Sequence, residues 1–380
     1  MPQDDLAEER NVSRIITDST PRQDGFRMPG EYEPQDQVWM IWPQRTDNWR
    51  DGAKPAQAAY AAVAKAVSAF TKVTMLVNAS QYENCRAQLP ADIRVIEMSS
   101  DDAWCRDCGP TFLVNDAGQI RGCDWRFNAW GGLVDGLYFP WDKDDQVAGK
   151  ICNLENIDYY RLRDFVLEGG SIHVDGEGTV MTTEMCLLSA GRNPHLTKKE
   201  IEETLKEYLN CEKVIWIADG IDPDETNGHV DDVACFVRPG EAACIYTDDP
   251  SHPFYRQAQE AYRTLSAQTD AKGRKLKVHK LCLTKEPVYL EGARTIDLTA
   301  NAVSREPGTL SIASYLNFLI TNGGIIAPQY GDPNDALALQ QLREMFPDRK
   351  VVGVYTREIV YGGGNIHCIT QQQPAVLTRI

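Results

Sequence analysis

The sequence lacks any long apolar run. No stretch reaches the eighteen or so apolar residues that a membrane-spanning helix needs, so we expect no membrane partner. Residues 1–14 are acidic and have no apolar core of the kind found in secretory signal peptides. Histidine is also scarce, with 6 residues in 380, and none shows H-x-x-x-H spacing. We therefore expect a cytoplasmic protein that holds no metal.

Basic residues are also fewer than acidic ones. Lys and Arg number 39 against 55 Asp and Glu, which gives a formal net charge of −16. Such a surface repels phosphate backbones and anionic lipids, so neither nucleic acid nor a membrane surface is an expected partner. It would attract a small cation, although an excess of acid also serves solubility alone.

The cysteines show no regular framework. There are 11 of them, an odd number scattered from Cys85 to Cys368, and this distribution favours a reducing compartment over a disulfide scaffold. Cys105 and Cys108 form a C-x-x-C pair, but residues three apart on a regular strand face opposite ways. A redox or zinc role for that pair is therefore disfavoured.

Strand and helix patterns alternate along the chain, which predicts an α/β fold. Residues 1–24 are polar and aperiodic and are predicted to be a mobile tail, and residues 25–380 show no linker and are predicted to be one catalytic domain. Strands are predicted at 38–42, 73–77, 93–98, 214–217, 233–237, 278–282, 325–327 and 351–354. Helices are predicted at 56–70, 144–155, 198–209, 255–269 and 335–345.

Five polar clusters recur at strand ends. Three of them join glycines to a histidine beside an apolar residue, at 168–173, 227–231 and 363–368, and two more lie at 101–110 and 317–324. Regular recurrence of this kind indicates repeated modules arranged around a centre. Polar residues from each module would then converge on one axial pocket.

The segment 361–370 is the most informative one. Its three consecutive glycines suit a backbone that turns tightly or lies close to a ligand. Residues 366–370 resemble a strand, whereas phosphate-binding loops lead into a helix, so a nucleotide site is disfavoured. What remains is a loop that delivers Cys368, whose thiolate would be a strong nucleophile. His367 would point to the opposite face of a strand and is a poor base for it.

Other polar residues supply candidate partners for this cysteine. His229 and Asp231 are two residues apart and would share one face of a strand. Glu168 stands between an apolar run and two glycines, where a buried carboxylate could handle protons. Asp107 would share a strand face with Cys105. A solvated acidic turn around an ordinary histidine is the alternative explanation of 224–232.

These motifs, in this order, resemble those of agmatine deiminases within the guanidino-group-modifying superfamily. The resemblance rests on 104–110, 168–173, 227–231 and 362–368, with support from 28–34, 42–50, 127–132 and 369–374. It implies a five-module, pseudo-symmetric α/β-propeller without a metal or organic cofactor. It also implies these roles: Cys368 as nucleophile, Glu168 and His229 as acid/base pair, Asp107 and Asp231 as guanidinium clamp, Glu225 facing the substrate amine, and Trp104 lining the pocket.

The implied reaction is hydrolysis of agmatine to N-carbamoylputrescine and ammonia through an amidino-cysteine intermediate. Two carboxylates can hold a flat guanidinium, and the acidic stretch around Glu225 suits the ammonium of agmatine better than the carboxylate of arginine. The alternatives are a deiminase or amidinotransferase for another guanidine, such as arginine or peptidyl-arginine, a metal hydrolase using His173, His229 and His367, and a non-catalytic scaffold. By resemblance we expect a homo-oligomer, with a role in polyamine metabolism, as putrescine synthesis or agmatine catabolism.

Overall fold

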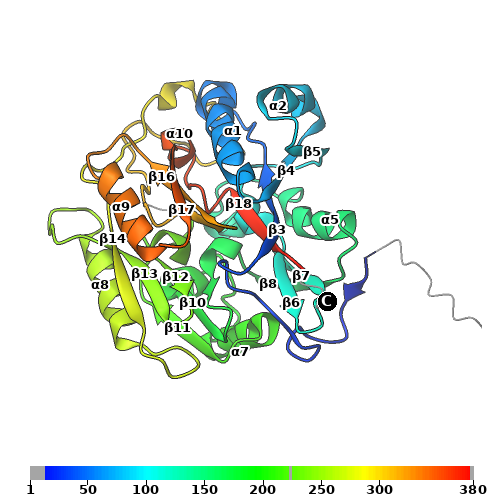
Figure 1. Cartoon of the computed structure of the whole chain (residues 1–380). Coiled ribbons are helices and arrows are strands. Elements are labelled where there is room, and N and C mark those ends of the chain that lie inside the picture. Colours follow the sequence, from blue (N-terminus) through cyan, green and yellow to red (C-terminus); the bar gives the residue numbers. More distant parts are fainter. Residues whose placement is uncertain (1–12, 222–224, 377–380) are drawn as a thin grey trace, which may run out of the picture.

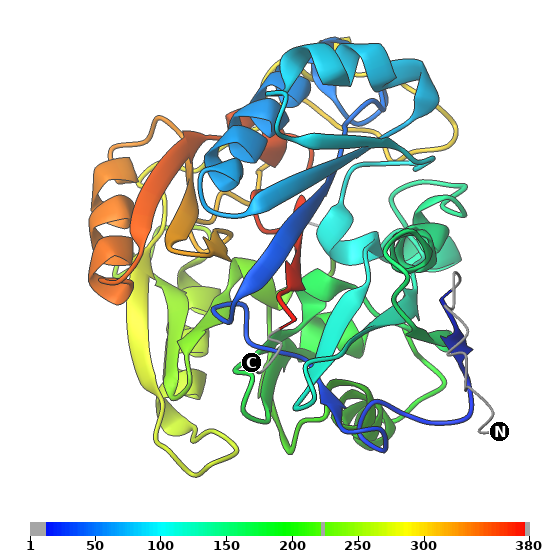
Figure 2. The same cartoon turned by 45° about the vertical axis from the view of Figure 1, so that its right-hand side comes forward.

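Five small sheets form the framework of the computed structural model, which describes residues 13–221 and 225–376. Each sheet repeats one plan: an inner strand runs antiparallel to the middle strand, and a helix then leads to an outer strand parallel to the middle one. Figures 1 and 2 show the sheets arranged around a common centre with the helices outside. The predicted α/β class is thus confirmed, with five modules.

The strand orders define the modules. They are β18-β3-β4-β5, β1-β8-β7-β6-β2, β11-β10-β9, β12-β13-β14 and β15-β16-β17. The strands are β1 Ile15–Ile16, β2 Phe26–Arg27, β3 Gln35–Ile41, β4 Lys72–Val77, β5 Arg94–Glu97, β6 Thr111–Asn115, β7 Ile120–Arg126, β8 Tyr159–Val166, β9 His173–Val174, β10 Thr179–Thr183, β11 Lys213–Ile217, β12 Ala234–Arg238, β13 Glu241–Tyr246, β14 Lys277–Cys282, β15 Leu319–Thr321, β16 Gly324–Gln329, β17 Lys350–Tyr355 and β18 Thr370–Pro374.

One helix connects the two parallel strands of each module. These helices are α1 Lys54–Ser68, α5 Val147–Leu154, α7 Lys198–Leu209, α8 Tyr255–Ala267 and α9 Asp335–Met345. The shorter ones are α2 Tyr82–Gln88, α3 Cys105–Cys108, α4 Gly132–Asp135, α6 Glu184–Leu187 and α10 Arg357–Val360, with 3-10 turns η1 Arg50–Ala53, η2 Ala79–Gln81, η3 Asp144–Gln146, η4 Gly169–Ser171, η5 Val230–Asp232 and η6 Ala293–Thr295. Among the described residues no helix is both long and apolar enough to cross a bilayer.

Local sequence accounts for the connecting helices. Helix α7 begins with the predicted capping box, in which Thr197 and Glu200 each accept a hydrogen bond from the other's backbone N–H. Helix α1 buries Tyr60, Val63 and Val67 on one face, as their spacing predicts. Amphipathic helices of this kind cover the sheets from outside and leave the strand ends free to point inward.

The first and last parts of the chain meet in one sheet. β18 pairs antiparallel with β3, and Figure 1 shows the two strands side by side. The buried indole of Trp39 donates to Gln373 Oε1 at 2.8 Å, and Gln37 Nε2 donates to the same oxygen at 3.0 Å. This pairing fixes the turn that immediately precedes β18, and that turn carries Cys368.

Several local predictions differ from the structure. Residues 13–24 were predicted to be part of a mobile tail, but β1 pairs with β8 and Ile16 is buried, so this part belongs to the fold; residues 1–12 lie outside the described residues. Segment 366–369 is a turn and not a strand. Residues 105–108 form a helical turn, and Val230–Asp232 a 3-10 turn, where strands were expected. Close packing at the centre selects these tight turns over local strand preference.

Candidate active site

The turns before four of the five inner strands carry candidate residues. Asp107 lies in α3 ahead of β6, Glu168 directly precedes η4 and β9, and His229 and Asp231 flank Val230 at η5 ahead of β12. Cys368 lies two residues before β18. Because α3, η4, η5 and β18 contact one another at the centre, residues up to 261 positions apart in sequence come together.

Gly170 marks the point where these side chains meet. A Cβ atom there would come within 2.6 Å of His229 Nδ1, 2.9 Å of Asp107 Oδ1 and 3.0 Å of Asp231 Oδ2. Real Cβ atoms do not approach other atoms so closely, so the absence of a side chain at 170 lets three functional groups converge.

The Cys368 thiol is buried and surrounded by polar atoms. Its Sγ lies 3.2 Å from Asn317 Nδ2, which can donate to sulfur, and 3.8 Å from Asp231 Oδ2. Burial, followed by the negative charges of Asp231, Asp232 and Asp107, raises the pKa of Cys368 well above its ordinary value. The resting group is therefore a neutral thiol.

His229 lies between two carboxylates. Nδ1 is 3.9 Å from Asp107 Oδ1, and Nε2 is 3.9 Å from Glu168 Oε2. Burial alone would lower the pKa of His229, but Asp107 and then the contacts to Cys186 and Glu168 raise this pKa well above its ordinary value. The raised pKa favours the protonated imidazole near neutral pH.

Two carboxylates near His229 have different environments. Glu168 Oε1 lies 2.8 Å from Arg192 Nε with both side chains fully buried, and although burial raises the pKa of Glu168, Arg192 outweighs it and lowers that pKa. Asp107 accepts from Trp130 Nε1 and from the Gly170 N–H, each at 2.9 Å. Burial raises the pKa of Asp107, so this carboxylate would gain from a bound cation.

A cavity of about 140 Å³ opens beside Cys368 and Asp107. Trp104 lines it, stacked on Trp49 with ring centroids 5.3 Å apart, and the helical turn α3 brings Trp104 and Asp107 to the same cavity. Glu225 also lines it, and Glu225 Oε1 accepts from Arg305 Nη1 at 2.7 Å. The cavity therefore combines an aromatic wall with acidic groups.

The glycine loop makes room for this cavity wall. Gly363 has φ 110°, a conformation that side chains disfavour, and a Cβ there would overlap Glu225. A Cβ at Gly364 would come within 2.6 Å of the Trp104 ring and 3.1 Å of Cys368 Sγ. The triple glycine thus lets backbone pack between the pocket wall and the thiol, as the sequence suggested.

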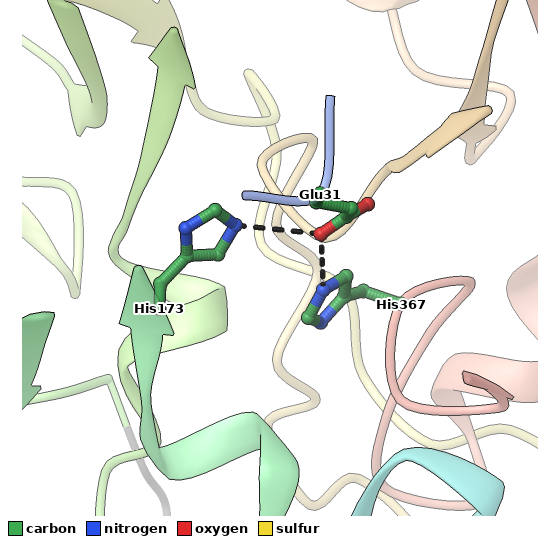
Figure 3. Close-up of side chains that lie close together, drawn as sticks. All are labelled: Glu31, His173 and His367. Atoms are coloured by element: carbon green, nitrogen blue, oxygen red, sulfur yellow. Dashed lines mark hydrogen bonds and ion pairs between the residues drawn. The ribbon is translucent and has the colours of Figure 1, made fainter. Parts of the chain in front are cut away.

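Three groups of side chains bring potential metal ligands within 4.8 Å of one another. They are Glu31–His173–His367, Glu168–Cys186–His229 and Asp231–Asp232–Cys368. In the first group, drawn in Figure 3, His173 Nδ1 accepts from the Phe236 N–H, so the neutral ring carries its hydrogen on Nε2 and has no lone pair there for a metal. Hydrogen bonding within the chain accounts for this cluster, and the absence of a cofactor stays a prediction.

Comparison with known proteins places the chain in a family. The profile of the Porphyromonas-type peptidyl-arginine deiminases matches residues 27–374, a range that includes all seven candidate residues. The chain belongs to this family. An agmatine deiminase of Pseudomonas aeruginosa is 58% identical over 94% of this chain and 98% of its own length. The predicted family is thus confirmed.

Solved structures of family members share the fold. That of the Enterococcus faecalis agmatine deiminase is 65% identical with a TM-score of 0.95, covering 96% of this chain and all of its own. The agmatine deiminase of C. jejuni is 27% identical with a TM-score of 0.77, covering 93% of this chain and 97% of its own. A five-module arrangement thus holds across this range of identity.

The structure brings Cys368, His229, Glu168, Asp107 and Asp231 together and places Trp104 and Glu225 at the adjoining cavity. Sequence reasoning missed other members: Asn317 at the thiol, Arg192 beneath Glu168, and Arg305 on Glu225. The cluster at 317–324 was a visible signal for Asn317, because it fills the same place in its module as the other four clusters. No local pattern marks the two arginines.

Proposed function

We propose that this chain hydrolyses agmatine to N-carbamoylputrescine and ammonia. One geometric observation carries the proposal: the imidazole of His229 and the carboxylates of Asp107 and Asp231 meet next to Gly170, and the sulfur of Cys368 lies 3.8 Å from Asp231 Oδ2. A flat cation held by the two carboxylates would present its central carbon to sulfur. Membership of a deiminase family supports hydrolysis of a guanidine, and the similarity to agmatine deiminases supports this substrate.

The first half-reaction forms a carbon–sulfur bond. Cys368 gives up its proton to solvent, its sulfur attacks the guanidinium carbon, and the resulting tetrahedral carbon bears sulfur and three nitrogens. His229 gives a proton to one terminal nitrogen, the carbon–nitrogen bond breaks, and ammonia leaves. Glu168 acts on His229 and on the substrate nitrogens as an ionised hydrogen-bond acceptor. What remains is a cationic amidino-thioether on Cys368.

The second half-reaction consumes water. His229, now without its proton, takes one from a water molecule whose oxygen attacks the amidino carbon. The carbon–sulfur bond breaks, the thiolate leaves and takes up the remaining proton of that oxygen, and the carbon keeps the oxygen as a carbonyl. The proton that Cys368 released at the start converts ammonia to ammonium. The sum is one guanidinium and one water converted to one urea-type product and one ammonium ion.

We infer that the substrate cation, and not a preformed ion pair, activates Cys368. Burial and three carboxylates raise the pKa of its thiol, and a bound cation would offset them. Chloroacetamidine, which is cationic, should therefore alkylate Cys368 at least about tenfold faster than neutral, nearly isosteric chloroacetamide at pH 7. Equal second-order rate constants after correction for reaction with free thiol would refute this route.

Glu225 is proposed to select for agmatine. The cavity lining includes Asp47, Asp102, Asp107 and Glu225 against Arg45 and Arg305. This excess of acid favours an ammonium at the far end of the substrate over the carboxylate of free arginine. Faster turnover of arginine or peptidyl-arginine than of agmatine would contradict the assignment, and a requirement for an acceptor amine without ammonia release would indicate an amidinotransferase.

The central experiment compares two cysteine variants. Cys368→Ala should abolish ammonia release from agmatine while leaving the circular dichroism spectrum unchanged. Cys282→Ala, at a partly buried thiol in β14, is the matched control and should keep wild-type turnover. Intact-mass analysis of quenched wild-type reactions should show an amidino adduct that is missing in Cys368→Ala. Turnover that survives Cys368→Ala would end the proposal.

The cellular setting and the assembly form a separate part of the proposal. We propose a cytoplasmic homo-oligomer that acts in polyamine metabolism, where the product is a precursor of putrescine. Free thiols throughout the described chain support a reducing compartment. Sedimentation equilibrium of the purified chain tests the oligomer, and cell fractionation tests the location.

A further inference from the structure

Glu31, His173 and His367 form a buried cluster that the proposed reaction does not use. Glu31 lies in the segment before β3, His173 begins β9, and His367 precedes Cys368 in its turn (Figure 3). All three side chains are at most 6% exposed. The cost of burying ionisable groups implies that their hydrogen bonds are specific.

Hydrogen bonding fixes Glu31 as an ionised acceptor. Its Oε1 accepts from the Ile320 N–H at 2.7 Å, and its Oε2 lies 2.9 Å from His367 Nε2 and 3.4 Å from His173 Nε2. His173 can only donate there, because its Nδ1 already accepts from the Phe236 N–H at 3.2 Å. With hydrogen bonds converging on both oxygens, Glu31 is a carboxylate.

His367 bridges Glu31 to the active site. Its Nδ1 lies 2.8 Å from Asp231 Oδ2 while its Nε2 contacts Glu31. An imidazole donates at both nitrogens only when it is protonated, so His367 is a cation between two carboxylates. Its backbone is also held, since its N–H donates to Asn317 Oδ1 and its carbonyl accepts from Arg106 Nε.

Asp231 is thereby held by one oxygen only. Oδ2 is bound to His367, whereas Oδ1 is buried and makes no hydrogen bond within the described chain. Asp107 differs, because both of its oxygens accept from protein donors. A buried carboxylate oxygen without a donor is costly, and a guanidinium N–H is the donor that the proposed reaction would bring.

We propose that Glu31 and His367 are positioning residues that orient Asp231, so that its Oδ1 faces the substrate guanidinium. Glu31 keeps His367 protonated, and His367 fixes the rotation of the Asp231 carboxylate. This role rests on the proposed function, since it assumes a guanidinium substrate. The proposal gives a role to Glu31, in the segment before β3, which takes part in no step of the proposed reaction.

The charge of His367 determines how the proposed positioning of Asp231 depends on pH. The groups that face His367 are Asp231 from η5, Glu31 from the segment before β3, Arg106 from α3 and His173 from β9. Burial and Arg106 lower the pKa of His367, but Glu31 and Asp231 outweigh them and raise it. The protonated form therefore persists as pH rises, and removing the charge of Glu31 should let the proton leave at lower pH.

The test measures agmatine binding in a Cys368→Ala background by calorimetry, so that chemistry does not interfere. Glu31→Gln keeps shape but removes charge, and it should raise Kd about fivefold to tenfold near neutral pH. The ratio of its Kd to that of the Cys368→Ala reference should grow as pH rises. His367→Asn, which keeps a donor near Asp231, should bind more tightly than His367→Gln, which does not. A purely structural role predicts neither the pH trend nor this order.

A thermodynamic cycle with Asp231→Asn completes the test. If Glu31 acts through Asp231, adding Glu31→Gln to Asp231→Asn should change Kd by less than twofold. Fully multiplicative effects, or a Glu31→Gln variant within twofold of the reference across pH 6 to 9, would overturn the inference. Should a His367 variant fail to fold, the isosteric Glu31→Gln still decides. Failure of the wild-type chain to turn over agmatine would instead refute the proposed function.

Discussion

Replacing Gly170 with alanine tests whether the catalytic groups converge where the structure places them. The new Cβ would lie 2.6 Å from His229 Nδ1, about 0.9 Å closer than the roughly 3.5 Å at which such atoms rest. Asp107 Oδ1 and Asp231 Oδ2 lie at 2.9 and 3.0 Å from the same Cβ. A shift of the backbone away from His229 would therefore bring the Cβ closer to one of these carboxylates. A misplacement near 1 Å costs about 10²-fold in rate, so kcat/KM for agmatine should fall by about 10²-fold, or about 2.7 kcal/mol of transition-state stabilisation.

The assay is continuous detection of ammonia with agmatine as substrate, alongside thermal unfolding. Gly353→Ala in β17 is the matched control, because its Cβ would meet Gln329 at 2.9 Å, next to Leu339 and none of the site residues. The control should lose stability and keep kcat/KM within about twofold. Wild-type kcat/KM in Gly170→Ala, with the fold retained, would show that the site is looser than these distances require.

Three further predictions concern other contacts. Asn317→Asp keeps the acceptor and removes the donor to Cys368 Sγ, so kcat should fall by up to about 10²-fold. Alkylation of Cys368 by iodoacetamide should also shift to higher pH, and an unchanged pH profile of alkylation would contradict this prediction. Arg192→Met leaves the buried carboxylate of Glu168 unpaired and should cost about 3–5 kcal/mol of unfolding free energy in urea titration, whereas a loss below 1 kcal/mol would refute a tight pair. Thr197→Ala removes the cap of α7 and should cost about 1 kcal/mol without altering kcat/KM.

The regular elements could be predicted because their sequence patterns are local. All eight predicted strands match observed strands within a few residues, and helices at 198–209 and 335–345 match α7 and α9 in full. Strands such as β7 and β10 were missed because polar and small residues dilute their alternation, and burial within a sheet overrides weak local preference. Sequence periodicity therefore predicts the helices and many of the middle and outer strands of the modules, but few of the inner strands and the turns before them.

Three turns that carry candidate residues, at 105–108, 230–232 and 366–369, were predicted as strands, and this error has a physical cause. Alternation at 104–109 put Trp104 and Asp107 on opposite faces, whereas the helical turn α3 brings both to the cavity. His367 was expected to face the opposite side of a strand from Cys368 and to be a poor base for it, and in the structure its ring contacts Asp231 and Glu31. Contacts between modules decide these conformations, and local sequence patterns do not reveal contacts between residues far apart in the chain.

Charge balance explains how the centre can distinguish substrate from product. The carboxylates that meet there are Glu31, Asp107, Glu168, Asp231 and Asp232, and the cations are Arg106, Arg192, His229 and His367. Carboxylates outnumber cations in this list, and a bound guanidinium would add positive charge in a site where charge is poorly solvated. The proposed hydrolysis would turn that guanidinium into a neutral urea group, so the carboxylates proposed to hold it would lose their attraction for this end of the product. In the proposed reaction, chemistry at Cys368 would therefore remove the charge at the reacting end of the ligand, which would favour release of the product from the centre.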